Sequence, residues 1–142
     1  MKRTMLIALI TAAVRKYLLF ALLLATASPV PAADLDPQKS SDHGVTIAVT
    51  PQTLSSDART WYFKIVLYTH SADLNDDLVK SAVLIGSGAK HVPVAWDRAG
   101  PGGHHREGVL RFSPLPGQPR AIELQITRSG EPAPRSFRWQ LK

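Results

Sequence analysis

The chain has 142 residues, of which 17 are basic and 11 acidic, so its formal net charge at pH 7 is +6. It contains no cysteine, which excludes disulfide bridges and a cysteine nucleophile. This length predicts one domain of common size that folds without covalent cross-links.

Residues 1–33 are typical of a cleaved signal peptide, in which two basic residues precede an apolar run. The run, residues 17–25, is too short to cross a bilayer, which takes roughly 20 apolar residues. Small residues follow, and we expect cleavage after Ala32 or Ala33, giving a periplasmic or secreted product with no stable membrane span. The alternative is a retained anchor that also uses residues 5–14, which would place the two basic side chains near the middle of the membrane.

Removal of this leader changes the charge of the chain. Four basic residues belong to the leader, so 13 remain against 11 acidic residues, and the net charge falls to +2. The basic pI of the full chain is typical of nucleic-acid binding, but no basic run or motif organises the remaining arginines. We therefore expect no nucleic-acid partner. The leader's basic residues are Lys2, Arg3, Arg15 and Lys16.

Residues 34–43 are polar, and we expect a flexible N-terminal segment there, followed by a β domain over residues 44–142. From residue 45 onward apolar and polar residues alternate, which is the period of β-strands. Leu74 and Leu78 are four residues apart, which is compatible with a helical turn within residues 73–82. The alternating pattern predicts strands at residues 45–49, 61–68, 81–86, 92–96, 110–112, 122–126 and 137–141, with Pro93 moving the fourth to a sheet edge.

Seven short strands separated by turn-rich segments predict an all-β fold, a single antiparallel immunoglobulin-like β-sandwich. The Cys–Trp–Cys pattern of true immunoglobulin domains is missing, so the prediction concerns the architecture only. Trp61, Trp96 and Trp139 are in phase with apolar neighbours and are predicted to lie in the core. Tyr62 and Tyr68 are out of phase with that face and are candidates for surface contacts.

Consecutive antiparallel strands alternate between the two ends of a sandwich, and this chain path places four of the five histidines at one end. His43 precedes the first strand, His70 follows the second, and His104 and His105 lie in the loop GPGGHHREG. Loops at one end of a rigid sandwich commonly carry binding residues. The carboxylates expected in the same loops are Asp73, Asp76, Asp77, Asp97 and Glu107.

Imidazoles and carboxylates together suit zinc, copper(II) or nickel. Adjacent side chains on a regular strand point to opposite faces, and the glycines of the histidine loop would let the backbone turn both imidazoles to one side. The alternative is that the histidines are solvated loop residues, with His70 tying its own loop by hydrogen bonds and residues 73–77 forming a solvated turn. The candidate metal ligands are His43, His70, Asp73, His104 and His105.

No catalytic motif stands out. The chain lacks a G-x-S-x-G elbow, and GSGAKH lacks the ending of a phosphate loop and is predicted to be a hairpin turn. We therefore expect a non-enzymatic protein that holds a divalent metal or an envelope partner. A structural or protein-interaction module, whose edge strand pairs with another envelope protein, is the alternative. A small metal-dependent hydrolase is the third hypothesis.

The segments THSADL and GGHHREGVLRF resemble a pair of segments, THS-x-DL and GGHHR-x-G-x-L-x-F, found in small exported bacterial β-sandwich proteins of uncharacterised function. The resemblance covers most of the chain after the leader and implies no activity. More loosely, the size, export and predicted fold are similar to those of periplasmic copper-carrier sandwiches. Those proteins use a histidine at the mature N-terminus, where this chain has ADLDP.

Overall fold

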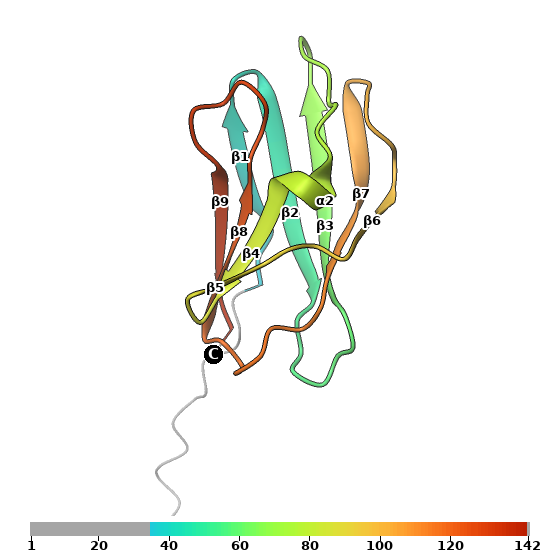
Figure 1. Cartoon of the computed structure of the whole chain (residues 1–142). Helices are drawn as coiled ribbons and strands as arrows, with labels where there is room; N and C mark the ends of the chain where they lie inside the picture. Colours follow the sequence, from blue (N-terminus) through green and yellow to red (C-terminus); the bar gives the residue numbers. More distant parts are fainter. Residues whose placement is uncertain (1–34, 142) are drawn as a thin grey trace, which may run out of the picture. The chain divides into compact units, whose positions relative to one another are not determined.

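The computed structural model describes residues 35–141, and the predicted signal peptide lies outside them. These residues form nine strands in two antiparallel sheets, together with one short helix (Figure 1). The all-β prediction is therefore confirmed, with nine strands where about seven were expected. No helix in this part of the chain is long and apolar enough to cross a membrane.

Every pair of neighbouring strands is antiparallel, and the chain passes between the sheets three times. The first sheet has the order β1 (Gln38–Asp42), β2 (Val45–Thr53), β3 (Trp61–Thr69), β7 (His105–Phe112) and β6 (Ala95–Arg98). The second has the order β5 (Ala89–His91), β4 (Ala82–Gly86), β8 (Ala121–Ile126) and β9 (Arg135–Gln140). The helical turn predicted after β3 is confirmed over the shorter span α2 (Leu78–Ser81).

The core forms where the inward residues of the two sheets meet, because side chains alternate between the faces of a strand. Burial alternates along the whole of β3, and Phe63 on this strand is fully buried. Its ring centroid lies 5.7 Å from that of Phe112 in an edge-to-face contact and 5.7 Å from that of Trp139. Trp61 and Trp139 are 2% exposed, which confirms that they belong to the core.

The strand predicted over residues 92–96 is wrong. β5 ends at His91 in the second sheet and β6 begins at Ala95 in the first, so the chain crosses between the sheets here. Pro93 is buried, while Val92 and Val94 are 70% and 57% exposed, the reverse of the predicted phase. Proline has no N–H for a sheet ladder and fixes its own φ, so the chain leaves the sheet at this residue.

Trp96 lies at the margin of the core, not inside it as predicted. It is partly buried on the edge strand β6, which only β7 flanks. Its indole N–H donates to the carbonyl of Ala99 at 2.7 Å. The indole covers Gly108, where an added Cβ would lie 2.6 Å from a ring carbon. This close approach explains the glycine in the middle of β7.

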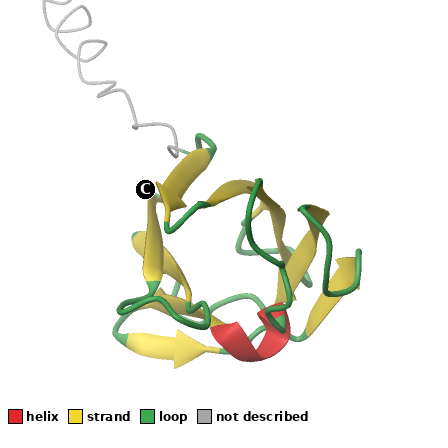
Figure 2. Ribbon diagram, turned by 90° about the horizontal axis from the view of Figure 1, so that it is seen from above, coloured by secondary structure: helices red, strands yellow, loops and turns green. Residues whose placement is uncertain are grey.

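Part of the segment expected to be flexible forms β1, which pairs with β2 through backbone hydrogen bonds. The amide of Gln38 bonds both the backbone N–H and the carbonyl of Arg138 on β9. From β9, the guanidinium of Arg135 donates to the carbonyls of Ser40 and Asp42. These polar contacts join the edges of the two sheets along one side, and Figure 2 shows the strands surrounding a common interior.

Candidate functional site

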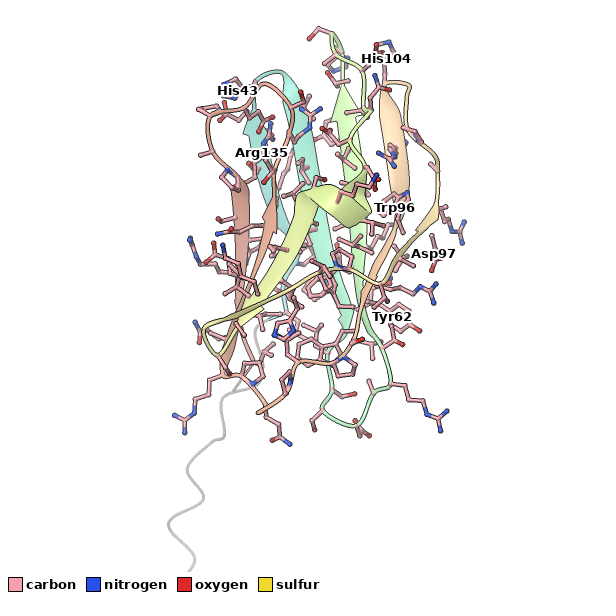
Figure 3. All side chains as sticks on the ribbon, viewed as in Figure 1. His43, Tyr62, Trp96, Asp97, His104 and Arg135 are labelled. Atoms are coloured by element: carbon pink, nitrogen blue, oxygen red, sulfur yellow. The ribbon has the colours of Figure 1, made fainter. Side chains whose placement is uncertain are left out.

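The histidine-bearing loops lie at one end of the two-sheet structure. The β1–β2 turn, the segment after β3 and the segment before β7 share this end because the three ladders are antiparallel. Figure 3 labels His43 and His104 at the upper end of the view. We use the name histidine rim for His70, His104 and His105, the three that follow or precede the paired strands β3 and β7.

The β3–β7 ladder brings the residues of the rim together. His105 lies opposite Tyr68 in the register, and the N–H of Thr69 donates to the carbonyl of His104 at 3.0 Å. His70 is the next residue, so its backbone lies beside that of His104. All three side chains of the rim are exposed to solvent.

Further backbone bonds hold the segment after β3 against the glycine turn before β7. Leu74 donates to the carbonyl of Gly103 at 3.3 Å and accepts from the N–H of Gly102 at 2.9 Å. Both glycines have positive φ, 107° and 75°, a conformation that side chains rarely adopt. The two segments therefore form one backbone-bonded unit, although about 30 residues separate them in the chain.

The other two candidate ligands lie outside the rim. The imidazole of His43 is 3.1 Å from the carboxylate of Asp42, which also accepts from the backbone N–H of His43. Asp73 is exposed beside the buried Leu74. Among residues 35–141, no group of three histidine, aspartate or glutamate side chains is arranged to hold a metal ion.

The remaining carboxylates predicted at this end are held by basic partners. Hydrogen bonding from the ammonium of Lys64 lowers the pKa of Glu107, and that from Lys80 lowers the pKa of Asp77. Asp77 also caps α2 through the N–H of Val79. The four ion pairs, at 2.8–3.3 Å, are Asp76 with Arg128, Asp77 with Lys80, Asp97 with Arg111 and Glu107 with Lys64.

Arg106, which the sequence analysis did not single out, is buried next to His105 and bonds the two loops beside the histidine rim. It is 3% exposed, and its guanidinium lies 5.2 Å from the ring centroid of Trp96. It donates to the carbonyl of Ala99, in the β6–β7 loop, at 3.1 Å. It also donates to the carbonyl of Asp76, between β3 and α2, at 2.5 Å. Burial lowers the pKa of Arg106, and the nearby carboxylates of Asp76 and Asp77 oppose this effect.

A second buried group of charges lies at the same end, between β9 and the loop before it. Glu131 is bonded by the guanidinium groups of Arg135 and Arg128, and Arg128 also pairs with Asp76. The hydrogen bond from Arg135 is the main cause that lowers the pKa of Glu131. Four buried charges thus connect the loop after β3 with the β8–β9 loop.

The inward arginines were missed, although their sequence phase identifies them. Arg106 is in phase with Leu110 and Phe112 along β7, and Arg135 is in phase with Phe137 along β9. A basic residue in phase with an apolar face must be buried and therefore paired, because an isolated buried charge is very costly.

The outward face of the first sheet carries the tyrosines predicted to make surface contacts. Tyr62 and Tyr68 are both partly exposed on β3. The ammonium of Lys39 lies 5.5 Å from the ring centroid of Tyr68. Hydrogen bonds with Lys39 and Thr46 lower the pKa of Tyr68.

The opposite end contains a pocket of about 970 Å³ that the sequence analysis did not predict. The β2–β3 loop and the β7–β8 loop form its two sides, and residues near both ends of the described chain complete it. Comparison of the chain with protein-family models, with curated proteins and with solved structures finds no match.

Proposed function

We propose that this protein is an exported, non-enzymatic binding module with an immunoglobulin-like sandwich, which holds a divalent metal ion at the histidine rim. The observation that carries the proposal is the placement of His70 beside His104 and His105 at the end of one antiparallel ladder. The packing of the rim uses arginine and glycine, so its imidazoles are exposed and available for a ligand.

The strand order supports the immunoglobulin-like assignment. The order β2-β3-β7-β6 corresponds to strands A-B-E-D, and the order β5-β4-β8-β9 corresponds to C′-C-F-G. In this correspondence, β1 is an additional edge strand beside A. The leader supports a periplasmic or secreted location, because its basic residues, short apolar run and small residues follow the order of a signal peptide.

The register favours His70 and His105 as the pair that meets the metal. His105 lies opposite Tyr68 in the register, and His70 directly follows Thr69, the last residue of β3. In a ladder continued by one residue the two would be diagonal neighbours, whose Cα atoms are about 7–8 Å apart, a separation at which two imidazoles can converge on one ion. The side chain of His104 would have to rotate toward this pair to become a third ligand, because no three such side chains within residues 35–141 are arranged to hold a metal ion.

Zinc and copper(II) are the metals that imidazole nitrogen suits best here. Two or three protein ligands leave coordination positions for water or for a side chain of a partner protein. The rim would therefore act as an open site that presents a metal, in contrast with a closed structural site.

Calorimetric titration of the protein with zinc and with copper(II) tests this proposal. We expect one site per chain that is lost in the His70→Ala/His105→Ala variant and retained in His43→Ala, the matched control at the same end. Because the imidazoles of the rim are exposed, the double variant should melt within a few degrees of the wild type. Titrations that are unchanged in the double variant would refute the metal site.

We use the name seam for a side of the structure where an edge strand of one sheet faces an edge strand of the other. A second candidate function is recognition of a partner strand at the seam between β5 and β6. The seam between β1 and β9 is closed by side-chain hydrogen bonds, whereas the crossover between β5 and β6 exposes Val92 and Val94. Open sheet edges accept strands from other proteins. A pull-down from envelope extracts separates the two functions: capture that a chelator abolishes supports the rim, and capture that only Val92→Lys/Val94→Lys abolishes supports the seam.

A further inference from the structure

The pocket at the end opposite the histidine rim is a second, independent candidate binding site. Its lining includes Trp61, where β3 begins, and Leu141, which follows β9. Figure 1 shows the start of β3 and the end of β9 at the lower end of the view. Its volume of about 970 Å³ is within the range of small-molecule sites, which are typically about 300–1,000 Å³. None of the metal-ligand candidates lines it.

The inner wall of the pocket is apolar and fixed. Trp61 and Leu115 are buried, and the polar atom of the indole already donates to the carbonyl of Ser55 at 3.0 Å, so the ring presents carbon to the pocket. Leu115 packs directly on Gly86, where no side chain would fit beside it. Because of these contacts, the inner wall keeps its shape when no ligand is bound.

Three further leucines give the pocket apolar surface that water still reaches. Leu35, Leu54 and Leu141 line it and are only partly buried against the core. Burial of such surface contributes about 25 cal/mol for each Å² removed from water. A ligand with an apolar body would therefore gain affinity by covering these side chains.

The charged residues that line the pocket balance each other. Of the residues that line it, Asp57 carries the one carboxylate and Arg120 the one guanidinium, and they stand on opposite loops. The other polar side chains of the lining are uncharged amides and hydroxyls, such as those of Gln52 and Gln118. A ligand with a net charge would meet one like and one opposite charge, so the lining favours neither sign.

A partner strand fits this site less well than a small molecule. The N–H of Leu141 donates to the carbonyl of Arg120 at 2.7 Å, which extends the β8–β9 pairing to the edge of the pocket. Backbone groups at this point are therefore already paired with each other. Gln118 has φ of 46°, beside Gly117 at 75°, so a tight left-handed turn shapes the lip of the pocket.

We propose that this pocket binds a small, neutral, amphipathic molecule, whose apolar body covers Leu54, Trp61 and Leu141 while a hydrogen-bonding end meets the amides at the lip. The proposal is independent of the histidine rim, because the two sites lie at opposite ends and share no residue.

The test uses 1-N-phenylnaphthylamine, a neutral apolar probe whose fluorescence rises in an apolar site. We expect saturable binding at one site per chain, and at least a tenfold loss of affinity in Leu54→Trp, which fills the pocket. Val92→Trp adds the same side chain at the exposed crossover and should bind as the wild type does. Leu141→Asp, a second variant at the partly exposed C-terminus, should lose affinity to a similar degree because it charges the apolar wall.

Three outcomes would overturn the proposal. The first is binding that is unchanged in both Leu54→Trp and Leu141→Asp, which would place the probe elsewhere. The second is an equal loss in Val92→Trp. The third is equal or tighter binding of the anionic probe 1-anilinonaphthalene-8-sulfonate, which would refute the neutral class of ligand.

Discussion

Replacement of Arg106 by alanine should destabilise the protein far more than replacement of an outward arginine on the same strand. The guanidinium makes short hydrogen bonds to the carbonyls of Ala99 and Asp76, and charged donors contribute about 1.5–3 kcal/mol each. The stacking on Trp96 adds about 0.5–2 kcal/mol. Allowing for water that enters the vacated space, we expect a loss of about 3–5 kcal/mol in the free energy of unfolding.

Urea unfolding followed by tryptophan fluorescence measures this loss. For a slope of about 2 kcal/mol per molar urea, the midpoint should fall by about 2 M. The matched control is Arg111→Ala, five residues along β7, which removes a half-exposed ion pair with Asp97 and should cost at most about 1 kcal/mol. Equal midpoint shifts in the two variants would refute the assignment of Arg106 as the residue that holds the rim together.

Three further predictions concern close packing, buried charge and the joined sheet edges. Gly108→Ala should lower the free energy of unfolding by about 1–3 kcal/mol, because the new Cβ would lie 2.5 Å from the carbonyl oxygen of Asp97, whereas Gly100→Ala has open space and should cost little; thermal melting compares the two. The lowered pKa of Glu131 gives stability that is fully present above the unfolded-state value of 4.5 and is lost as the pH falls through the lower folded value. Midpoints of urea unfolding from pH 7 to 3 should show this loss in the wild type and a flatter profile in Glu131→Gln, which should be about 3 kcal/mol less stable at pH 7. Gln38→Ala should cost about 1–2 kcal/mol and speed amide exchange at Arg138, since it removes the side chain that bonds this residue on the edge of β9.

Elements with strong alternation could be predicted from the sequence. β3 and β9 each alternate buried and less buried residues over their whole length, so the period of two identifies both the strand and its inward face. A helical turn was predicted from the spacing of Leu74 and Leu78, which are both buried, but Leu74 lies before α2, so this spacing does not mark one face of the helix. In these segments the hydrophobic effect decides the structure, and it leaves a direct signal in the order of residue types.

The missed strands lack such a signal, because backbone pairing and polar side chains stabilise them. β1 has the sequence QKSSD, with no apolar residue, and its pairing depends on β2 and on the arginine from β9. β5 and β6 have three and four residues, too few to establish a period. Val92 and Val94 do alternate with Pro93, but the chain crosses to the other sheet at this proline. The alternation therefore does not indicate a strand.

The histidine end could be predicted in outline, and its detail could not. Antiparallel alternation correctly placed His70, His104 and His105 at one end, because that argument needs only the order of the strands. It could not foresee that His43 pairs with Asp42 or that the expected carboxylates are held by basic partners, since these are side-chain contacts. The pocket was not predicted because loops form it, and loop residues far apart in the sequence carry no common pattern.

The residues of the segment GPGGHHREG form two groups: some shape the turn and the packing, and the two histidines are exposed to solvent. Gly102 and Gly103 make a turn that side chains rarely adopt, and Arg106 and Gly108 face inward, where one bonds two loops and the other admits an indole. The two histidines between them are exposed and make no contribution to this packing through their side chains. Their substitution should therefore leave the scaffold unchanged, whereas substitution of the arginine or the glycines should destabilise it. A loss of metal binding in a histidine variant with unchanged stability would consequently report on the site itself, which is why the rim is open to a clean experimental test.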